Sequence, residues 1–302
     1  MPQVYGEGIV MRILDRSTVL LGLERLGFDH RSLAEIRKWC GKPQGLIVAT
    51  GPTGSGKTTL LYSCLSEISS PDLKALTIED PVEYILPGVN QVQVNAKAGL
   101  RFAGAMRAFL RQDPDILMCG ELRDLETANL CVEAALTGHL VFTTLHTPDT
   151  AGAVTRLLDM GVERFLISAT LIGIAAPRLA RRLCPHCRRP AQEDVAQLLL
   201  AEVEKDASVG GYTAPAGATF YTAEGCEQCR RTGYLGRTGL FELMAWNPTL
   251  SEALRRGATE AELTQIAVAH GMRTLLAEAL RMAVAGETSL EEVIRVTGHG
   301  VY

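Results

Sequence analysis

The segment from Gly51 to Thr58 has the pattern Gly-x-x-x-x-Gly-Lys-Thr, which is typical of loops that bind nucleotide phosphates. It follows an apolar run of strand length, residues 46–50, and opens a segment with helical spacing, residues 58–68. Glycines let backbone N–H groups turn toward phosphate oxygens, and the helix N-terminus presents the positive end of its dipole to the same anion. An ordinary Gly-rich turn is the alternative, but the complete pattern and both flanks favour a nucleotide.

From this pattern we predict that the chain binds ATP with magnesium. Lys57 would neutralise charge on the β- and γ-phosphates, and the Thr58 hydroxyl would coordinate Mg²⁺. The nucleotide-binding residues expected here are Gly51, Pro52, Thr53, Gly54, Ser55, Gly56, Lys57, Thr58 and Thr59.

Hydrolysis needs more than a phosphate cradle, because water must be oriented and the metal must be anchored. Glu79, Asp80 and Glu83 follow the strand-like run 75–78. In open α/β sheets ligands bind at the carboxyl ends of the strands, which is where these carboxylates would lie. A surface turn is the alternative reading, since Asp-Pro favours turns.

A second acidic motif follows the apolar run 116–119, where Gly120 precedes Glu121. This arrangement is of the Walker B kind, in which Glu121 would hold the magnesium shell or polarise water. The upstream Asp113 and Asp115 are expected to shape the turn into the strand.

Two histidines flank the strand-like run 141–145. His139 and His146 would lie on opposite faces of one strand, about 23 Å apart, so they cannot share a metal. His146, at the carboxyl end, can face the γ-phosphate. A hydrogen-bonded structural role is the alternative for either residue, and for His139 the two readings are evenly balanced.

Positive charge for the transition state could come from several arginines. Arg107 and Arg111 are one helical turn apart on one face of a predicted helix, and Arg12 and Arg16 have the same spacing near the N-terminus. Each of them could instead be a solvated surface residue.

Four of the eight cysteines form two Cys-x-x-Cys pairs separated by 38 residues. Two such pairs match a tetrahedral structural zinc site with no open position for catalysis. Two disulfides are the rival interpretation, and the absence of a signal peptide argues against them. The predicted zinc ligands are Cys184, Cys187, Cys226 and Cys229, whereas Cys40, Cys64, Cys119 and Cys131 stand in apolar segments and are expected to be reduced and buried.

The order of the predicted elements indicates the fold that must position these residues. Short apolar strands alternate with helices from residue 46 to 145, which predicts an α/β fold with a parallel sheet covered on both faces. A hydrophobic share of 47%, a charged share of 21% and a net charge of −4 are typical of a soluble globular chain and do not indicate nucleic-acid binding. No apolar run reaches the length of a membrane span, so we expect a cytoplasmic protein.

Taken together, these motifs resemble the secretion ATPase superfamily, the hexameric motors of type II secretion and type IV pilus assembly. The resemblance runs from about Val4 to Val296. The segment 77–83 resembles the family's Asp box, 110–124 its Walker B region, and 137–147 its His box. The paired Cys-x-x-Cys is similar to the metal-binding insertion of the assembly and secretion branch, which retraction motors generally lack.

The resemblance implies a RecA-like P-loop core assembled as a homo-hexamer with nucleotide at subunit interfaces. It makes Glu83 the expected general base, Glu121 a ligand of magnesium-bound water, and His146 a sensor of the γ-phosphate. Arg107, Arg111, Arg12 and Arg16 become candidates for contacts to the phosphates. The implied partner is the inner-membrane platform protein of a pilus or secretion machine, so membrane contact would be indirect, at the periphery of the inner membrane.

The expected organisation has five parts. Residues 1–16 would be a remnant of a preceding domain, 17–44 a linker, 45–180 the RecA-like core, 181–237 the zinc module and 238–302 a helical C-terminal region. One rival function is a nucleic-acid-dependent motor, which the basic run of Arg178, Arg181, Arg182, Arg188 and Arg189 could support, although a solvated or interface face is the favoured reading of that run. A second rival is an assembly platform that binds ATP without turnover, which the intact Lys57, Glu83 and Glu121 oppose.

Overall fold

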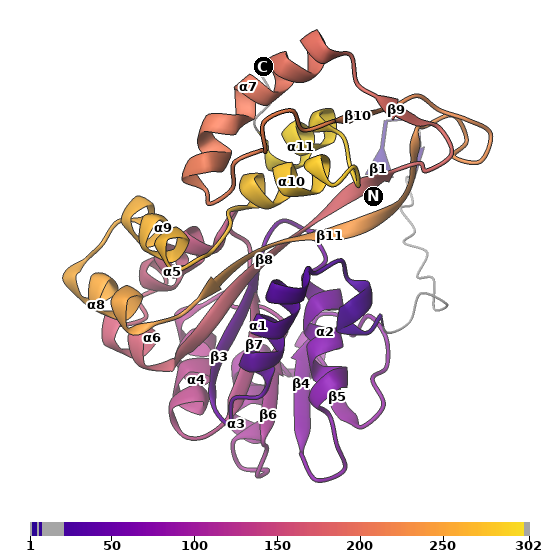
Figure 1. Cartoon of the computed structure of the whole chain (residues 1–302). Coiled ribbons are helices and arrows are strands. Elements are labelled where there is room, and N and C mark those ends of the chain that lie inside the picture. Colours follow the sequence, from indigo (N-terminus) through magenta and orange to yellow (C-terminus); the bar gives the residue numbers. More distant parts are fainter. Residues whose placement is uncertain (1, 5, 8–20, 299–302) are drawn as a thin grey trace.

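The computed structural model describes residues 2–4, 6–7 and 21–298. Its centre is a seven-stranded sheet with the strand order β11-β8-β3-β7-β6-β4-β5, in which every neighbouring pair is parallel except β11 with β8 (Figure 1). The predicted α/β fold with a mostly parallel sheet is therefore confirmed. The strands are β3 (Gly45–Thr50), β4 (Ala75–Glu79), β5 (Val89–Gln93), β6 (Ile116–Cys119), β7 (Leu140–Leu145), β8 (Leu171–Leu183) and β11 (Tyr234–Ala245).

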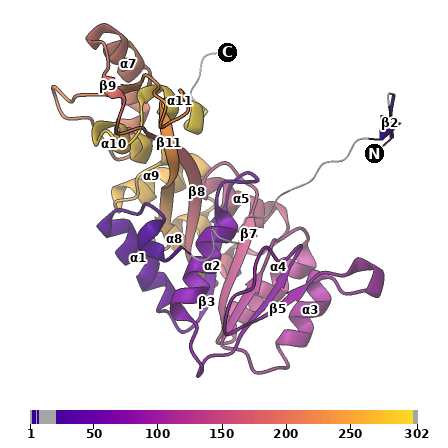
Figure 2. The ribbon, with the colours of Figure 1, turned by 90° about the vertical axis from the view of Figure 1, so that its right-hand side faces the viewer.

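Both faces of the sheet are buried because successive side chains of a strand point to opposite sides. In β3, Leu46 and Val48 join one hydrophobic core, whereas Ile47 and Ala49 join the other. Figure 2 shows α1 (His30–Cys40) and α2 (Lys57–Ile68) on one side of the sheet and α3 (Phe102–Phe109) and α4 (Leu125–Leu136) on the other. The core on the second side extends through α5 (Thr150–Asp159), α6 (Arg164–Thr170), α8 (Pro248–Arg256) and α9 (Glu260–Ala269).

The strands β8 and β11 continue past the sheet as a long antiparallel ribbon that carries a third core (Figure 1). The predicted domain boundaries at 180 and 237 fall inside these two strands. The structure also contains a 17-residue helix, α7, within the run 191–217, for which no helix was expected; Val203 and Ala207 on that helix are fully buried. The elements at this end are β9 (Arg188–Pro190), α7 (Glu193–Val209), β10 (Tyr221–Ala223), α10 (Leu275–Val284) and α11 (Leu290–Thr297).

Before the core, β1 (Pro2–Gln3) pairs with β2 (Gly6–Glu7) in a short antiparallel hairpin. Arg12 and Arg16 lie outside the described residues. The segment expected to be a linker contains a 3-10 turn, η2 (Leu23–Arg25), and α1, which the Asp29 side chain caps by accepting from the Ser32 backbone N–H at 2.7 Å. A second 3-10 turn, η3 (Ala96–Ala98), precedes α3. Within the described ranges, no helix combines the length and apolarity needed to cross a bilayer.

Candidate active site and cysteine cluster

The phosphate loop lies between β3 and α2, as predicted. Gly56 immediately precedes α2 with a φ of 101°, a left-handed conformation that favours glycine. Gly51 is also constrained by its surroundings, because an added Cβ would lie 2.5 Å from the Arg178 guanidinium and 2.7 Å from the Ser55 hydroxyl. The backbone of this loop therefore approaches its neighbours more closely than any side chain would allow.

Lys57 folds back over this loop. Its ammonium donates to the Gly51 carbonyl and, at 3.1 Å, to the Pro52 carbonyl, and the side chain is buried. Burial, assisted by the positive charge of Arg178 and opposed by Glu121, lowers the pKa of Lys57 to about 8. The hydrogen bonds of the ammonium thus go to neutral carbonyls, and a phosphate anion would supply negative charge.

The loop residues fit a magnesium nucleotide. The Ser55 hydroxyl is buried without a hydrogen-bond partner in the described part of the chain, so it is available to a phosphate oxygen. Thr58 stands in the first turn of α2 and is half-buried, as a magnesium ligand at this position would be.

Glu121 and His146 meet beside Lys57. Both follow neighbouring parallel strands, β6 and β7, whose carboxyl ends reach the same edge of the sheet. The His146 Nε2 lies 3.6 Å from a Glu121 carboxylate oxygen, and its Nδ1 lies 3.4 Å from the Lys57 Nζ. Three of the residues predicted to do chemistry are therefore brought together.

Arg123 is also part of this edge, although no role of its own was predicted for it. It forms an ion pair with Glu121, and its guanidinium lies 3.7 Å from the Asp80 carboxylate. It therefore bridges the two acidic motifs. In the sequence, its position two residues after Glu121 could have indicated that it lies near the acidic motif.

Glu83 lies in the loop that follows β4, and β4 pairs with β6, the strand that precedes Glu121. Its backbone N–H donates to the Tyr62 hydroxyl at 3.4 Å, and the residue is half-buried. Among the residues that the structure describes, the Glu83 carboxylate has no hydrogen-bond or ion-pair partner, which leaves it free to accept a proton or orient water.

The other predicted polar residues lie elsewhere. Arg107 forms an ion pair with Glu126 of α4, and Arg111 is exposed just past the end of α3. His139 stands at the opposite end of β7 from His146, where its Nδ1–H donates to the Ala134 carbonyl at 2.9 Å. This hydrogen bond supports a structural role for His139, which was the alternative to a role in chemistry.

Arg178 lies closer to the phosphate loop than the sequence suggested. We expected a solvated or interface face for the basic run, but Arg178 is half-buried beside Gly51 and donates to the Pro148 carbonyl in the segment after His146. The prediction was wrong for this residue because β8 neighbours β3, and strand order cannot be read from the motif.

The four predicted zinc ligands form one cluster. Their sulfurs all lie within 4.8 Å of one another, and the nearest pairs are 3.7–3.8 Å apart. Tetrahedral zinc with Zn–S bonds of about 2.3 Å requires S···S distances of about 3.8 Å, whereas a disulfide requires about 2.05 Å. Two backbone N–H groups, of Cys226 at 3.1 Å and Gly233 at 3.2 Å, donate to the Cys229 sulfur, and backbone donors of this kind lower its pKa to about 6. The donor set fits a closed zinc site.

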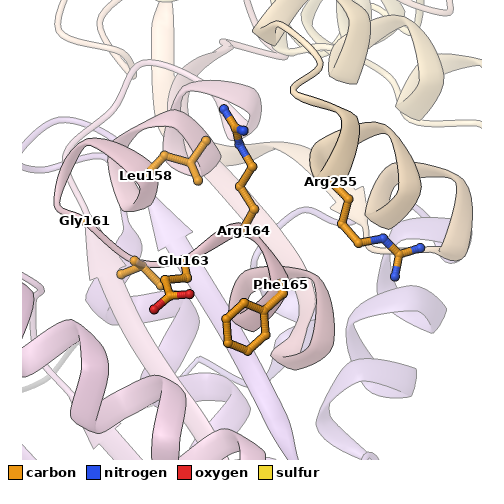
Figure 3. A pocket seen from close by; sticks show the side chains of 7 residues that line it. Leu158, Gly161, Glu163, Arg164, Phe165 and Arg255 are labelled. Atoms are coloured by element: carbon orange, nitrogen blue, oxygen red, sulfur yellow. The ribbon is translucent and has the colours of Figure 1, made fainter.

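A separate hollow of about 550 Å³ lies between α6 and α8 (Figure 3). It contains none of the residues predicted to do chemistry, and its most prominent apolar group is the Phe165 ring, which is 56% exposed. Its lining residues are Leu158, Gly161, Val162, Glu163, Arg164, Phe165 and Arg255.

Comparisons with known proteins agree with the motifs. The type IV pilus assembly ATPase PilB of Myxococcus xanthus is 49% identical over 294 residues, which cover 97% of this chain and 51% of that protein. The type II secretion system protein HxcR of Pseudomonas aeruginosa is 47% identical over 296 residues, covering 98% of this chain and 58% of that protein. The crystal structure of the pilus retraction motor PilT with bound ADP matches with a TM-score of 0.68 and 27% identity, covering 94% of this chain and 68% of that one.

The chain spans about half the length of the curated relatives it matches. A family model described as "Type II/IV secretion system protein" matches residues 1–295. This match covers nearly the whole chain and includes both the phosphate loop and the four-cysteine cluster. The chain belongs to the type II/IV secretion system protein family.

Proposed function

We propose that this chain hydrolyses ATP to ADP and phosphate as part of a hexameric motor that drives type IV pilus extension or type II protein secretion. The observation that carries the proposal is the convergence of Lys57, Glu121 and His146 at the phosphate loop. The similarity to proteins named as a pilus assembly ATPase and as a type II secretion protein supports it.

In the proposed mechanism the loop N–H groups, the Ser55 hydroxyl and Lys57 hold the β- and γ-phosphates. Thr58 and Glu121 would hold magnesium, which supplies charge neutralisation at the transferred phosphoryl group. Glu83 orients water toward the γ-phosphate as general base. His146, within reach of Lys57 and Glu121, senses whether the γ-phosphate is present.

Arginine charge at the transition state would come from a neighbouring subunit. Arg111 is exposed, and Arg107 is held by an exposed ion pair with Glu126 that a phosphate could displace, so both can reach the site of an adjacent copy in a hexamer, and Arg12 with Arg16 would act from the preceding domain. Nucleotide-dependent movement between the core and that domain would be passed to an inner-membrane platform protein. The chain would thus act in the cytoplasm at the periphery of the inner membrane.

The cysteine cluster is proposed as a structural zinc site within a module that spans roughly residues 181–237, between the core and the helical C-terminal region. Two of the ligands follow the C-terminal end of β8 and two precede the N-terminal end of β11, and these strand ends pair at one end of the ribbon. Zinc would fix those ends without taking part in hydrolysis.

A nucleic-acid motor is disfavoured by the contacts of the basic run. Arg181 pairs with the buried carboxylate of Glu292, Arg188 donates to the Gly286 carbonyl, and Arg189 pairs with Glu224. These three guanidinium groups hold elements of the cysteine end together, so they do not form the row of available cations that binding to a nucleic-acid backbone requires.

The test is magnesium-dependent ATP hydrolysis measured against protein concentration. We expect the rate per subunit to rise steeply with concentration, and Glu83→Gln to lower it at least 100-fold, in line with the loss of a general base. Glu133→Gln, an exposed change of the same chemistry on α4, is the matched control and should keep the wild-type rate. A flat rate per subunit that ignores Glu83 would contradict both the interface site and the assignment of the base.

A further inference from the structure

The loop that carries Glu83, residues 80–86, has no regular secondary structure, yet side chains of other elements hold it. Three backbone N–H groups of the loop donate to side-chain oxygens: Val82 to Gln93 at 3.2 Å, Glu83 to Tyr62 at 3.4 Å, and Leu86 to Gln91 at 2.6 Å. Because these acceptors belong to α2 and β5, the position of Glu83 depends on those elements rather than on a backbone ladder.

Tyr62 is central to this arrangement. It is fully buried on α2, the helix that begins at Lys57 in the phosphate loop. Its hydroxyl donates to Glu79 and accepts from the Glu83 N–H and, at 3.3 Å, from the Gln91 side-chain amide. Its ring packs edge-on against Tyr84 of the same loop, with centroids 4.6 Å apart. One side chain of the phosphate-loop helix thus contacts the Glu83 loop through both its hydroxyl and its ring.

Glu79 fixes the Tyr62 hydroxyl in turn. The carboxylate is 3% exposed and accepts three hydrogen bonds, from Tyr62, from the Thr77 hydroxyl at 2.6 Å and from Gln91 at 3.1 Å. Burial and the adjacent carboxylate raise the pKa of Tyr62 far above its usual value, so the hydroxyl keeps its proton and donates. A buried network in which every member is satisfied holds one geometry.

We propose that Tyr62 and Glu79 form a positioning pair that holds the Glu83 loop in register with the phosphate loop. The proposal rests on the function proposed above, in which Glu83 is the base. Tyr62 does not touch the reacting atoms, so its removal acts by displacing Glu83. A misplacement of about 1 Å at a catalytic group costs on the order of 100-fold in rate.

The first test is Tyr62→Phe, which keeps the ring and removes the hydroxyl. We expect kcat for ATP hydrolysis to fall about 10- to 100-fold while KM for ATP stays within about threefold, because the phosphate loop itself is unchanged. Tyr234→Phe is the matched control, since it removes a hydroxyl bonded to Ser289 at 2.8 Å far from this loop, and it should leave kcat unchanged. A Tyr62→Phe enzyme whose kcat equals the wild-type value would overturn the proposal, whether or not its KM for ATP is raised.

A double-mutant cycle separates positioning from general destabilisation. Glu83→Asp shortens the proposed base and should retain a measurable rate; adding Tyr62→Phe to it should lower kcat by less than about threefold, because the base is already displaced. Independent, multiplicative effects would show that Tyr62 acts by another route. If Tyr62→Phe does not fold, Gln91→Met takes its place in the cycle, because it removes the amide that donates to both Tyr62 and Glu79. A loss of less than about threefold in the Glu83→Asp background would again support positioning, and multiplicative effects would contradict it.

The proposed function and this inference fail differently. Loss of wild-type hydrolysis, or indifference of the rate to Glu83→Gln, contradicts the function. An active wild type that needs Glu83 but not Tyr62 or Gln91 contradicts only the positioning pair.

Discussion

The phosphate-loop edge of the sheet and the cysteine end of the molecule treat polar groups in opposite ways. At the phosphate-loop edge, Lys57 is buried and donates to carbonyls of the loop itself. Among the described residues, the Ser55 hydroxyl and the Glu83 carboxylate have no hydrogen-bond partner. At the cysteine end, the buried Glu292 accepts from Arg181 and Arg295, and backbone N–H groups donate to the Cys229 sulfur.

The difference is the one that the proposed functions of the two regions require. Burial raises the pKa of Glu292, but the hydrogen bonds from Arg295 and Arg181 outweigh burial and hold that pKa below its usual value. At Lys57 burial wins and lowers the pKa to about 8. A region that serves stability satisfies its charges within the chain, whereas a region that binds a charged ligand leaves part of its interaction energy for that ligand.

The largest effect that tests this comparison is expected for Lys57→Ala. ATP hydrolysis should fall by at least about 100-fold, because the transition state loses its principal intrachain cation. Thermal stability should stay the same or rise, since the change removes a buried ammonium that is bonded to neutral carbonyls and lies near the positive charge of Arg178. Phosphate release and the Tm of the same preparation measure both quantities.

Two results would contradict this account of Lys57. A marked fall in Tm would mean that Lys57 serves the fold as Glu292 does. Retained hydrolysis would remove it from the site.

Metal removal is the corresponding test at the cysteine end. A strong chelator, or Cys184→Ser, should lower the Tm by roughly 10 °C, because losing a few kcal/mol shifts Tm by about 2–4 °C per kcal/mol in chains of this size. Nucleotide binding by the isolated chain should persist, since the phosphate loop lies in another core. Zinc content, Tm and binding of a fluorescent ADP analogue are the measurements.

Cys131→Ala is the control for the chelation experiment, because Cys131 is a buried cysteine of α4 outside the cluster. It should retain the full metal content. Equal metal content after Cys184→Ser would contradict the assignment of the ligands.

The same contrast explains which features the sequence could predict. The phosphate loop is contiguous, and its flanking strand and helix appear at β3 and α2 nearly as expected. Glu121 and His146 could also be paired in advance, because each follows a buried strand and the carboxyl ends of parallel strands share one edge. The four cysteines were recognisable from spacing alone.

The residues that escaped prediction depend on strand order and packing. Arg178 reaches Gly51 because β8 lies beside β3, although the two are more than 120 residues apart in the chain. Tyr62 was expected as part of a helix and Glu79 as one of the carboxylates at the ligand end of a strand, or in a surface turn, and neither expectation joined the two buried residues. The helix α7 is the exception, because Ala196, Leu200, Val203 and Ala207, which belong to or pack against the third core, recur at helical spacing and could have predicted it.

The smallest expected effect is the pH dependence of nucleotide binding, and it concerns Lys57 alone. In the free protein its pKa is depressed to about 8 by burial, whereas bound phosphates would raise it again. Above pH 8 binding must therefore take up a proton, so affinity for magnesium ADP should fall about tenfold per pH unit until the pKa of the complex is reached. Below pH 8 Lys57 is already charged, and this proton linkage disappears.

Folding stability should change in the opposite direction over the same window. The unfolded chain, with an ordinary lysine pKa of 10.5, binds more protons than the folded chain between pH 8 and 10.5, so stability from this group rises with pH. Lys57→Arg keeps its charge throughout and should bind with a weaker but flat profile. Titration of affinity by equilibrium dialysis, with Tm measured beside it, distinguishes the cases. A wild-type affinity that stays constant from pH 7 to 9.5 would mean that Lys57 is compensated within the chain, and the contrast with the cysteine end would then be lost.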